Sequence, residues 1–322
     1  MASNNSNNFN TLRKLSDVTF DNEEKKPART SPPRSPHTEK PSKTPTTTST
    51  TTTTTTTTTK SLDDGDVAIS LGGCGFLGVY QLGAIKMIYQ HGKKLMDRTV
   101  RYAGCSSGSL AAAMLLLCPE KIDEALQNMY DVAEEINNHT LGVMKPGLII
   151  SQRLRTGMEN VLPQDISKAQ NRLYVSVTKL MKLENELISS FESREHLIDV
   201  LLASCHHPLW SNGIKGPQSP VLNGENYIDG GYTKLIPTFS DITTVTISAY
   251  ASDASICPIE KSIFNDDTTC RVMNHNMKIS FANLRRVKLS LLPPPKEELV
   301  KYYELGAEDA KQFLIRNNVY NE

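Results

Sequence analysis

Residues 99–117 read TVRYAGCSSGSLAAAMLLL and decide the fold class of the chain. The first five residues have the content of a buried strand, and the last eight have the content of a buried helix. Ser106 lies at the turn between them, flanked two residues away on each side by Gly104 and Gly108. Small residues are required at those two positions because the turn brings its two backbones almost into collision. The stretch therefore predicts a strand, a strained turn with Ser106 at its apex, and a helix.

A second glycine-rich turn precedes this one in the chain. Residues 67–71, VAISL, are typical of a buried strand and lead into the loop GGCGFLG at residues 72–78, after which residues 79–90 have helical character. A glycine loop that opens a helix presents free backbone N–H groups. Such groups can bind a phosphate or stabilise the oxyanion of a tetrahedral acyl intermediate.

A third motif follows far downstream, where Tyr227 and Ile228 lead into Asp229, Gly230 and Gly231. An isolated Asp-Gly-Gly usually forms a turn and nothing more. The order of the three motifs in one chain is more specific than any one of them.

With these residues the chain resembles the patatin-like phospholipases, and within them the animal-type branch of adipose triglyceride lipase and adiponutrin. The resemblance rests on residues 73–78, 104–108 and 229–231 and on Ile256-Cys257-Pro258, and it extends over roughly residues 66–321. It implies a three-layer α/β/α sandwich with a mostly parallel central sheet. It also implies hydrolysis of lipid acyl esters by a Ser–Asp dyad, without a metal or an organic cofactor.

The roles of individual residues follow from the same resemblance. Ser106 corresponds to the nucleophile and Asp229 to its partner. Many plant and bacterial members carry a basic residue in this loop, whereas this chain has Phe76-Leu77. The difference favours a neutral lipid such as triacylglycerol over a phospholipid. The remaining motif residues correspond to an oxyanion hole (Gly73, Cys74, Gly75, Gly78) and to the glycines of the elbow and the acidic turn (Gly104, Gly108, Gly230, Gly231).

One departure from the family pattern keeps a non-catalytic alternative open. Many members carry an asparagine two residues before a proline in this region, but Leu235 stands there, before Pro237. A catalytically weak regulator that binds lipid or a protein partner is therefore an alternative. A dinucleotide-binding protein is a weaker one, because its glycine fingerprint requires an acid at the end of the second strand. Asp97 precedes that strand instead.

Composition limits the class of protein further. The 322 residues include 35 basic and 35 acidic side chains, so bulk charge does not favour nucleic acid. Six cysteines without a C-x-x-C pair suit a reducing compartment. The N-terminus lacks the apolar segment of a secretory signal, and the longest apolar run is too short to span a membrane. We expect a cytoplasmic enzyme that associates peripherally with lipid droplets or membranes, with a protein coactivator left open.

The chain divides into two parts by composition. Residues 1–64 are rich in Asn, Ser, Pro and Thr and include an unbroken threonine run at 50–59. Such a segment has too little apolar surface to offset its chain entropy, so we predict a disordered tail. Residues 65–322 are predicted to form the catalytic domain, including a helical C-terminal segment.

The remaining pattern alternates strands and helices, which favours a mostly parallel sheet covered on both faces. Ser193 is expected to cap a helix from Arg194 to about Cys205. The other expected elements are a helix at 123–136 and strands at 173–177, 187–191 and 243–249. Residues 140–150 are apolar and suit a buried loop or a lipid-facing lip.

Histidines are not assigned catalytic roles. His206 and His207 are adjacent and lack further ligands at metal spacing, so an imidazole at a helix C-terminus is the simpler interpretation. His275 is the one histidine that follows Asp229 in the chain, as a Ser/Asp/His triad in hydrolase order would require. Its polar setting predicts a surface residue, which leaves a dyad of Ser106 and Asp229.

Overall fold

The computed structural model describes residues 62, 65–139, 149–208, 210–211, 219–263 and 268–322. These residues belong to one compact unit. Apart from Leu62, which packs against the core, the predicted tail 1–64 lies outside the described residues. Most of the apolar segment at 140–150 lies outside them as well.

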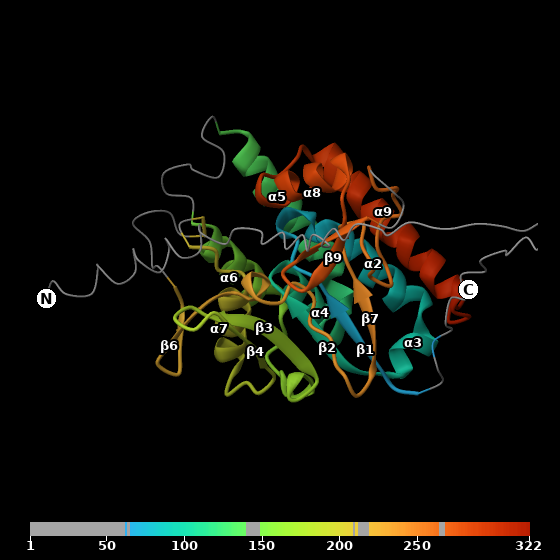
Figure 1. Cartoon of the computed structure of the whole chain (residues 1–322). Coiled ribbons are helices and arrows are strands. Elements are labelled where there is room, and N and C mark those ends of the chain that lie inside the picture. The colour runs from blue at the N-terminus through green and yellow to red at the C-terminus, as the bar shows by residue number, and fades with distance from the viewer. Residues whose placement is uncertain (1–61, 63–64, 140–148, 209, 212–218, 264–267) are drawn as a thin grey trace, which may run out of the picture. The chain divides into compact units, whose positions relative to one another are not determined.

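A mixed, mostly parallel sheet forms the centre of the fold (Figure 1). Its strand order is β5-β6-β3-β2-β1-β7, with β4 also paired to β3. The neighbours β7, β1, β2 and β3 run parallel, whereas β4 and β6 run antiparallel to β3. The sheet strands are β1 (Val67–Leu71), β2 (Thr99–Cys105), β3 (Leu173–Lys179), β4 (Glu184–Ile188), β5 (Val221–Leu222), β6 (Glu225–Asp229) and β7 (Thr243–Ile247). A separate hairpin consists of β8 (Thr269–Val272) and β9 (His275–Lys278).

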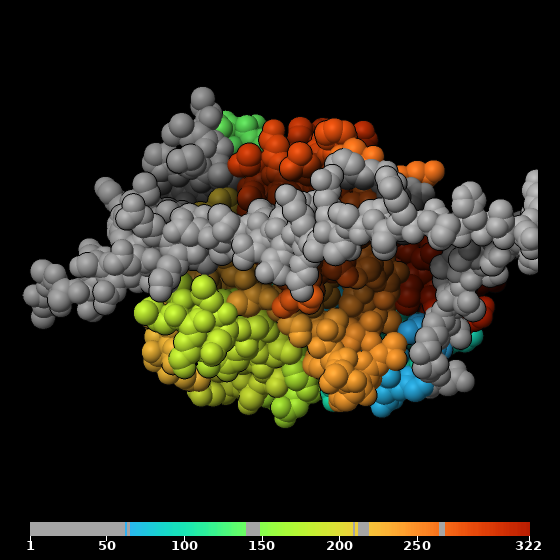
Figure 2. Space-filling model, viewed as in Figure 1, coloured from blue at the N-terminus to red at the C-terminus, as the bar shows by residue number. Residues whose placement is uncertain are grey.

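Helices pack against this sheet. Figure 2 shows the orange and red residues of the C-terminal part at the top of the view and the yellow-green residues of β3 and β4 at the lower left. All five residues of β1 are buried, which requires cover on both faces of the sheet at its centre. The α-helices are α2 (Gly78–His91), α3 (Lys93–Asp97), α4 (Ser107–Leu117), α5 (Ile122–Asn137), α6 (Ile150–Val161), α7 (Arg194–Ser204), α8 (Phe281–Leu291) and α9 (Lys296–Arg316). Short 3₁₀ turns are η1 (Gly75–Leu77), η2 (Pro119–Lys121), η4 (Ser167–Ala169) and η5 (Gly230–Tyr232).

The α2 and α9 helices cross with their backbones in close contact. A Cβ added at Gly83 would lie 2.0 Å from the carbonyl oxygen of Tyr303, and one added at Gly306 would lie 1.9 Å from that of Tyr80. Only glycine allows this approach. The crossing ties the C-terminal helix to the helix that follows the glycine loop.

The predicted α/β class and mostly parallel sheet are confirmed, and the element positions agree closely. Ser193 caps α7, with its Oγ accepting the N–H of His196 at 3.1 Å. One strand differs: β4 ends at Ile188, whereas the sequence placed it at 187–191. It forms a hairpin with β3, and Leu183 in the turn has a positive φ of 53°.

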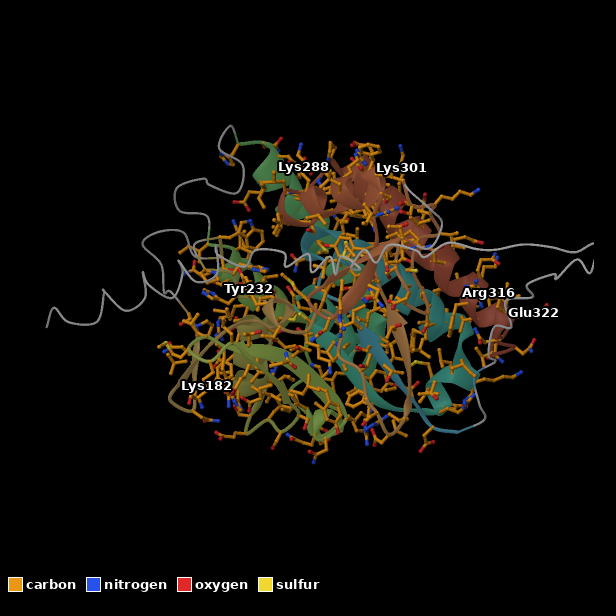
Figure 3. All side chains as sticks on the ribbon, in the orientation of Figure 1. Lys182, Tyr232, Lys288, Lys301, Arg316 and Glu322 are labelled. Carbon is orange, nitrogen blue, oxygen red and sulfur yellow. The ribbon has the colours of Figure 1, made fainter. Side chains whose placement is uncertain are left out.

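Charged side chains such as Lys182, Lys288 and Lys301 are exposed (Figure 3).

Candidate active site

Ser106 occupies a strained turn between β2 and α4. Its backbone has φ 53° and ψ −131°, a region that residues other than glycine rarely adopt. A Cβ added at Gly104 would lie 2.2 Å from the carbonyl oxygen of Gly108, and one added at Gly108 would lie 2.3 Å from that of Leu71. The two glycines are therefore required by the close approach of the backbones, as the motif predicts.

Neighbouring serines hold this turn in place. The N–H of Ser106 donates to Oγ of Ser204 at 2.8 Å, and that hydroxyl donates to the carbonyl of Ser176 at 2.7 Å. The hydroxyl of Ser109 donates to the carbonyl of Ser106 at 2.7 Å. Side chains from α7 and α4 thus fix the strained backbone to β3, which offsets part of its strain energy.

The glycine loop lies directly against Ser106. A Cβ added at Gly73 would be 3.1 Å from Cβ of Ser106. Gly75 has φ +53°, and a Cβ there would be 2.0 Å from the carbonyl oxygen of Ser290 in α8. The loop is therefore pressed between the elbow and α8, and no larger residue fits at Gly75 without a shift of the backbone.

The backbone N–H groups of this loop differ in their partners. The N–H of Gly73 donates to the carbonyl of Leu235 at 3.3 Å, and the N–H of Cys74 donates to Oγ of Ser107 at 3.0 Å. The N–H of Gly78 donates to the carbonyl of Gly75 in η1. Within the described part of the chain, the N–H groups of Gly75 and Phe76 have no hydrogen-bond partner. Of the four predicted oxyanion residues, Gly75 is thus the one whose N–H is free.

Asp229 is buried at the end of β6, on the turn that Gly230 and Gly231 allow. Its Oδ1 accepts the N–H of Gly231 at 2.7 Å and the thiol of Cys105 at 3.4 Å. A Cβ at Gly230 would lie 2.2 Å from the carbonyl oxygen of Ser176, so this turn packs tightly against β3. These contacts hold the carboxylate through one oxygen, Oδ1.

The second oxygen of Asp229 faces His207, a contact that sequence reasoning missed. Nε2 of His207 lies 3.1 Å from Oδ2 of Asp229, and Nδ1 lies 3.3 Å from the hydroxyl of Tyr232. Burial disfavours protonation of this imidazole, but the charge of Asp229 and its hydrogen bond outweigh burial, so the pKa of His207 is raised. The sequence offers no signal for this contact, because His207 precedes Asp229 in the chain and follows closely on the end of a helix.

The prediction that His275 is a surface residue is wrong. Its side chain is only 6% exposed, in β9, with Nδ1 at 3.5 Å from Oδ1 of Asp253. Burial lowers the pKa of His275, against the charge of Asp253. The polar residues around it suggested exposure, but they belong to a hairpin whose inward face carries His275 and Met277. His275 does not line the cavity described next.

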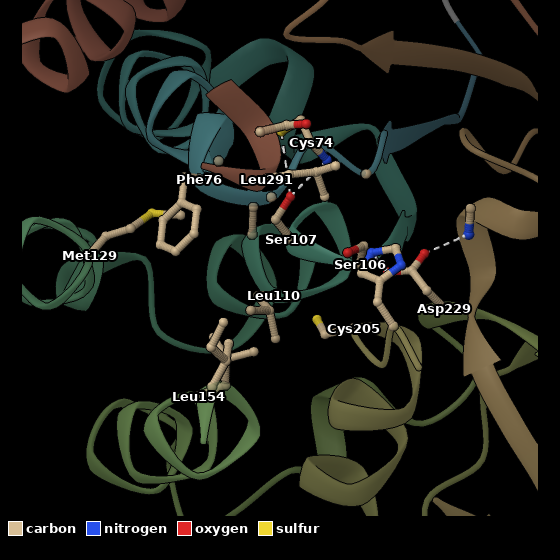
Figure 4. A pocket seen from close by; sticks show the side chains of 18 of the residues that line it. Cys74, Phe76, Ser106, Ser107, Leu110, Met129, Leu154, Cys205, Asp229 and Leu291 are labelled. Carbon is tan, nitrogen blue, oxygen red and sulfur yellow. Dashed lines mark hydrogen bonds and ion pairs between the residues drawn. The ribbon is translucent and has the colours of Figure 1, made fainter. Parts of the chain in front are cut away.

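Ser106, His207 and Asp229 line one cavity of about 540 Å³. Figure 4 shows Ser106 and Asp229 among its lining residues. Ser107, beside them, binds the N–H and the thiol of Cys74, as the dashed lines in the figure mark. The rest of the lining is mostly apolar and comes from several helices and loops, including Phe76, Leu110, Met114, Met129, Leu154 and Trp210. The arrangement is suited to binding an apolar chain next to a serine.

Leu235 packs between the glycine loop and the acidic turn. A Cβ added at Gly73 would lie 3.4 Å from Cδ1 of Leu235, and one added at Gly231 would lie 3.5 Å from the same atom. Leu235 therefore adds an apolar wall where many family members carry an amide. This wall helps to exclude water from the carboxylate.

The buried thiols of the site are poor nucleophiles. Burial raises the pKa of Cys74 to about 12, with the Ser107 hydroxyl acting in the opposite direction. Burial also raises the pKa of Cys205, which the hydroxyls of Ser106 and Ser109 lower in part. These cysteines remain protonated at neutral pH, so a serine is the stronger candidate nucleophile.

The residues that the structure describes form no cluster of His, Cys, Asp and Glu suited to a metal ion, and His206 and His207 belong to no such group. Within the same residues, no helix has the length and apolar character needed to cross a membrane.

Known proteins resemble this chain over most of its length. The family profile of the patatin-like phospholipases matches residues 69–241. The chain is 40% identical over 253 residues to patatin-like phospholipase domain-containing protein 4 of Homo sapiens, covering 78% of this chain and 98% of that protein. It is 34% identical over 253 residues to omega-hydroxyceramide transacylase of Homo sapiens, covering 78% of this chain and 46% of the relative.

A third relative has a similar extent. Patatin-like phospholipase domain-containing protein 2 of Homo sapiens is 31% identical over 256 residues, covering 79% of this chain and 49% of the relative. This chain therefore spans about half the length of the transacylase and of this third relative. The matches include the adipose triglyceride lipase and adiponutrin branch that the motifs predicted. The chain belongs to the patatin-like phospholipase family.

Proposed function

We propose that the protein is a serine acyl hydrolase of lipids in which Ser106 is the nucleophile and Asp229 the base. Family membership supports a lipid hydrolase or acyltransferase. The observation that carries the finer assignment is the strained turn of Ser106, which opens with Asp229 and the free N–H groups of the glycine loop into one apolar cavity.

The proposed reaction has two halves. Ser106 Oγ attacks the ester carbonyl and its proton moves to Oδ2 of Asp229, while the N–H groups of Gly75 and Phe76 stabilise the oxyanion. The proton then passes to the leaving alcohol, and an acyl-enzyme remains. Water, activated by Asp229 in the same way, releases the fatty acid and restores Ser106.

An acyl transfer uses the same intermediate with an alcohol in place of water. The name of one relative, a transacylase, supports this second outcome. Water and an alcohol attack the same carbonyl of the acyl-enzyme. The ratio of hydrolysis to acyl transfer therefore depends on which of the two acceptors reaches the apolar cavity.

A neutral acyl ester is the substrate class that the lining supports. A phosphodiester headgroup is bound in proteins by arginine or lysine. Among the described residues that line the cavity, Arg153 is the one such side chain, and it is ion-paired with Glu135 at 2.8 Å. We therefore favour acylglycerols over phospholipids.

A labelling experiment with a panel of lipids tests the assignment. A fluorophosphonate probe should label the wild type, and Ser106→Ala should abolish both labelling and hydrolysis. Asp229→Asn should lose about as much hydrolysis, at least about 10³-fold, because the two residues act as a unit. Labelling that persists in Ser106→Ala would exclude Ser106 as the nucleophile. A folded wild type that hydrolyses no lipid or short ester would favour a regulator.

A further inference from the structure

The α8 helix is oriented with its polar residues inward and its apolar residues outward. Asn283, Arg286 and Ser290 are buried, with 3%, 6% and 6% of their surfaces exposed. On the other side, Phe281 and Leu284 are 77% and 69% exposed, and Val287 and Leu291 are both 43% exposed. A helix at the surface of a soluble domain normally has the opposite arrangement.

Specific bonds hold α8 in this orientation. The side-chain amide of Asn283 accepts the N–H of Ala251 at 2.9 Å and donates to the carbonyls of Ala251 and Lys278, both at 2.8 Å. Arg286 forms an ion pair with Glu260 at 2.6 Å. A rotation that turned the apolar residues inward would break all of these bonds, so the exposed apolar face is a stable feature of the fold.

The exposed apolar face continues into the candidate active site. Val287 and Leu291 are half exposed and also line the cavity that contains Ser106. Figure 4 shows Leu291 on the side of the pocket where Cys74 and Phe76 lie. The carbonyl of Ser290 touches Gly75, whose N–H is free to bind an oxyanion. One helix thus reaches from the outer surface to the reacting centre.

We propose that the outward face of α8, formed by Phe281, Leu284, Val287 and Leu291, is the surface that docks the enzyme on a neutral-lipid interface. Docking places the cavity mouth against the lipid, so an acyl ester enters past Val287 and Leu291 without crossing water. This inference rests on the proposed function, because a lipid hydrolase needs such a route to a substrate that is insoluble in water.

The charges on α8 itself favour insertion by the hydrophobic effect rather than attraction to anionic lipid. Arg286 is buried against Glu260, and Arg285 forms an ion pair with Glu298. Lys288 is the one exposed cation of the helix for which no ion pair is found among the described residues. Anionic membranes are instead bound by clusters of lysine and arginine. An amphipathic helix with few free charges binds mainly through its buried apolar area.

Phe281 and Leu284 allow a clean test, because they are strongly exposed and do not line the cavity. The variant Phe281→Ser/Leu284→Ser is compared with the wild type by flotation with triolein droplets coated with phosphatidylcholine. Loss of two large apolar contacts should weaken binding at least about tenfold. Hydrolysis of the droplets should fall by a similar factor, whereas turnover of a soluble short-chain ester should stay unchanged.

Exposed apolar residues far from α8 supply a matched control. Met181 and Val221 are 61% and 60% exposed. They lie near the β3–β4 turn, and Figure 3 shows Lys182 of that turn far from Lys288 of α8. The variant Met181→Ser/Val221→Ser should bind droplets as the wild type does. Equal melting temperatures show that all three proteins are folded.

Several outcomes would overturn the proposal. Unchanged droplet binding of Phe281→Ser/Leu284→Ser would do so, as would wild-type binding that requires anionic lipid and is lost in high salt. A wild-type dimer that the same variant converts to a monomer in sedimentation would show that α8 pairs two copies. Absence of Ser106-dependent turnover of the soluble ester would count against the proposed function, while flotation would still report on α8.

Discussion

At the scale of single residues, the hydroxyl of Ser107 positions the glycine loop. It accepts the N–H of Cys74 at 3.0 Å, which holds the loop beside the elbow. Ser107 is also the nearest rival of Ser106 as a nucleophile in sequence, but it lies in the first turn of α4, outside the strained position. The two serines therefore have separable roles.

Ser107→Ala should keep fluorophosphonate labelling but slow ester hydrolysis about tenfold, because a loop that has lost its anchor holds the oxyanion donors less well. The measurement is kcat and the labelling rate on a soluble ester. Ser107→Thr, which retains a hydroxyl, is the matched control and should be closer to the wild type. Complete loss of labelling in Ser107→Ala, with Ser106→Ala still labelled, would reverse the assignment.

A second residue-scale prediction concerns His207 and pH. When His207 is protonated, its positive charge stabilises the Asp229 carboxylate and makes it a weaker base. The pKa of His207 is raised above its ordinary 6.5 by Asp229, in spite of burial. We therefore expect kcat/KM to rise as pH increases through this pKa and to level off at a lower value below it.

His207→Gln removes the titrating group but keeps an N–H donor for Asp229. Its pH profile should lose the acidic limb and exceed that of the wild type at acid pH. The control is His139→Gln, at an exposed histidine just after α5. The pH profile of its kcat/KM should match that of the wild type. Superimposable profiles for His207→Gln and the wild type would show that His207 does not act on Asp229.

At the scale of elements, the crossing of α2 and α9 depends on the absence of a side chain. Gly306→Ala would place a Cβ 1.9 Å from the carbonyl oxygen of Tyr80, so the helices must move apart. We expect a loss of about 1–3 kcal/mol in the free energy of unfolding, which corresponds to a melting temperature lower by roughly 3–10 °C. Gly65→Ala meets no atom within 4 Å and should melt as the wild type does.

At the scale of the whole molecule, the described core is drawn from residues beyond the first sixty. Its apolar clusters begin at Leu62 and Val67 among the described residues. Removal of residues 1–60 should therefore leave the melting temperature and the turnover of a soluble ester unchanged, because that segment has few apolar residues to contribute to a core. A fall of many degrees would show that the segment packs on the domain.

The sequence by itself determined the local features of the site. Gly104, Ser106 and Gly108 could be recognised because backbone strain limits which residues tolerate such a turn. The same applies to Gly75 in the glycine loop and to the turn after Asp229, since each depends on neighbours within a few positions. Strand and helix content in turn predicted the α/β class and the mostly parallel sheet.

Only the tertiary structure decided which distant residues meet. The contact of His207 with Asp229 arises because the chain after α7 passes the end of β6, and no spacing encodes that proximity. The burial of His275 depends on the packing of a hairpin, and the outward apolar face of α8 depends on bonds that Asn283 and Arg286 make to other segments. A periodic pattern shows that a helix has two faces, but only packing decides which face is buried.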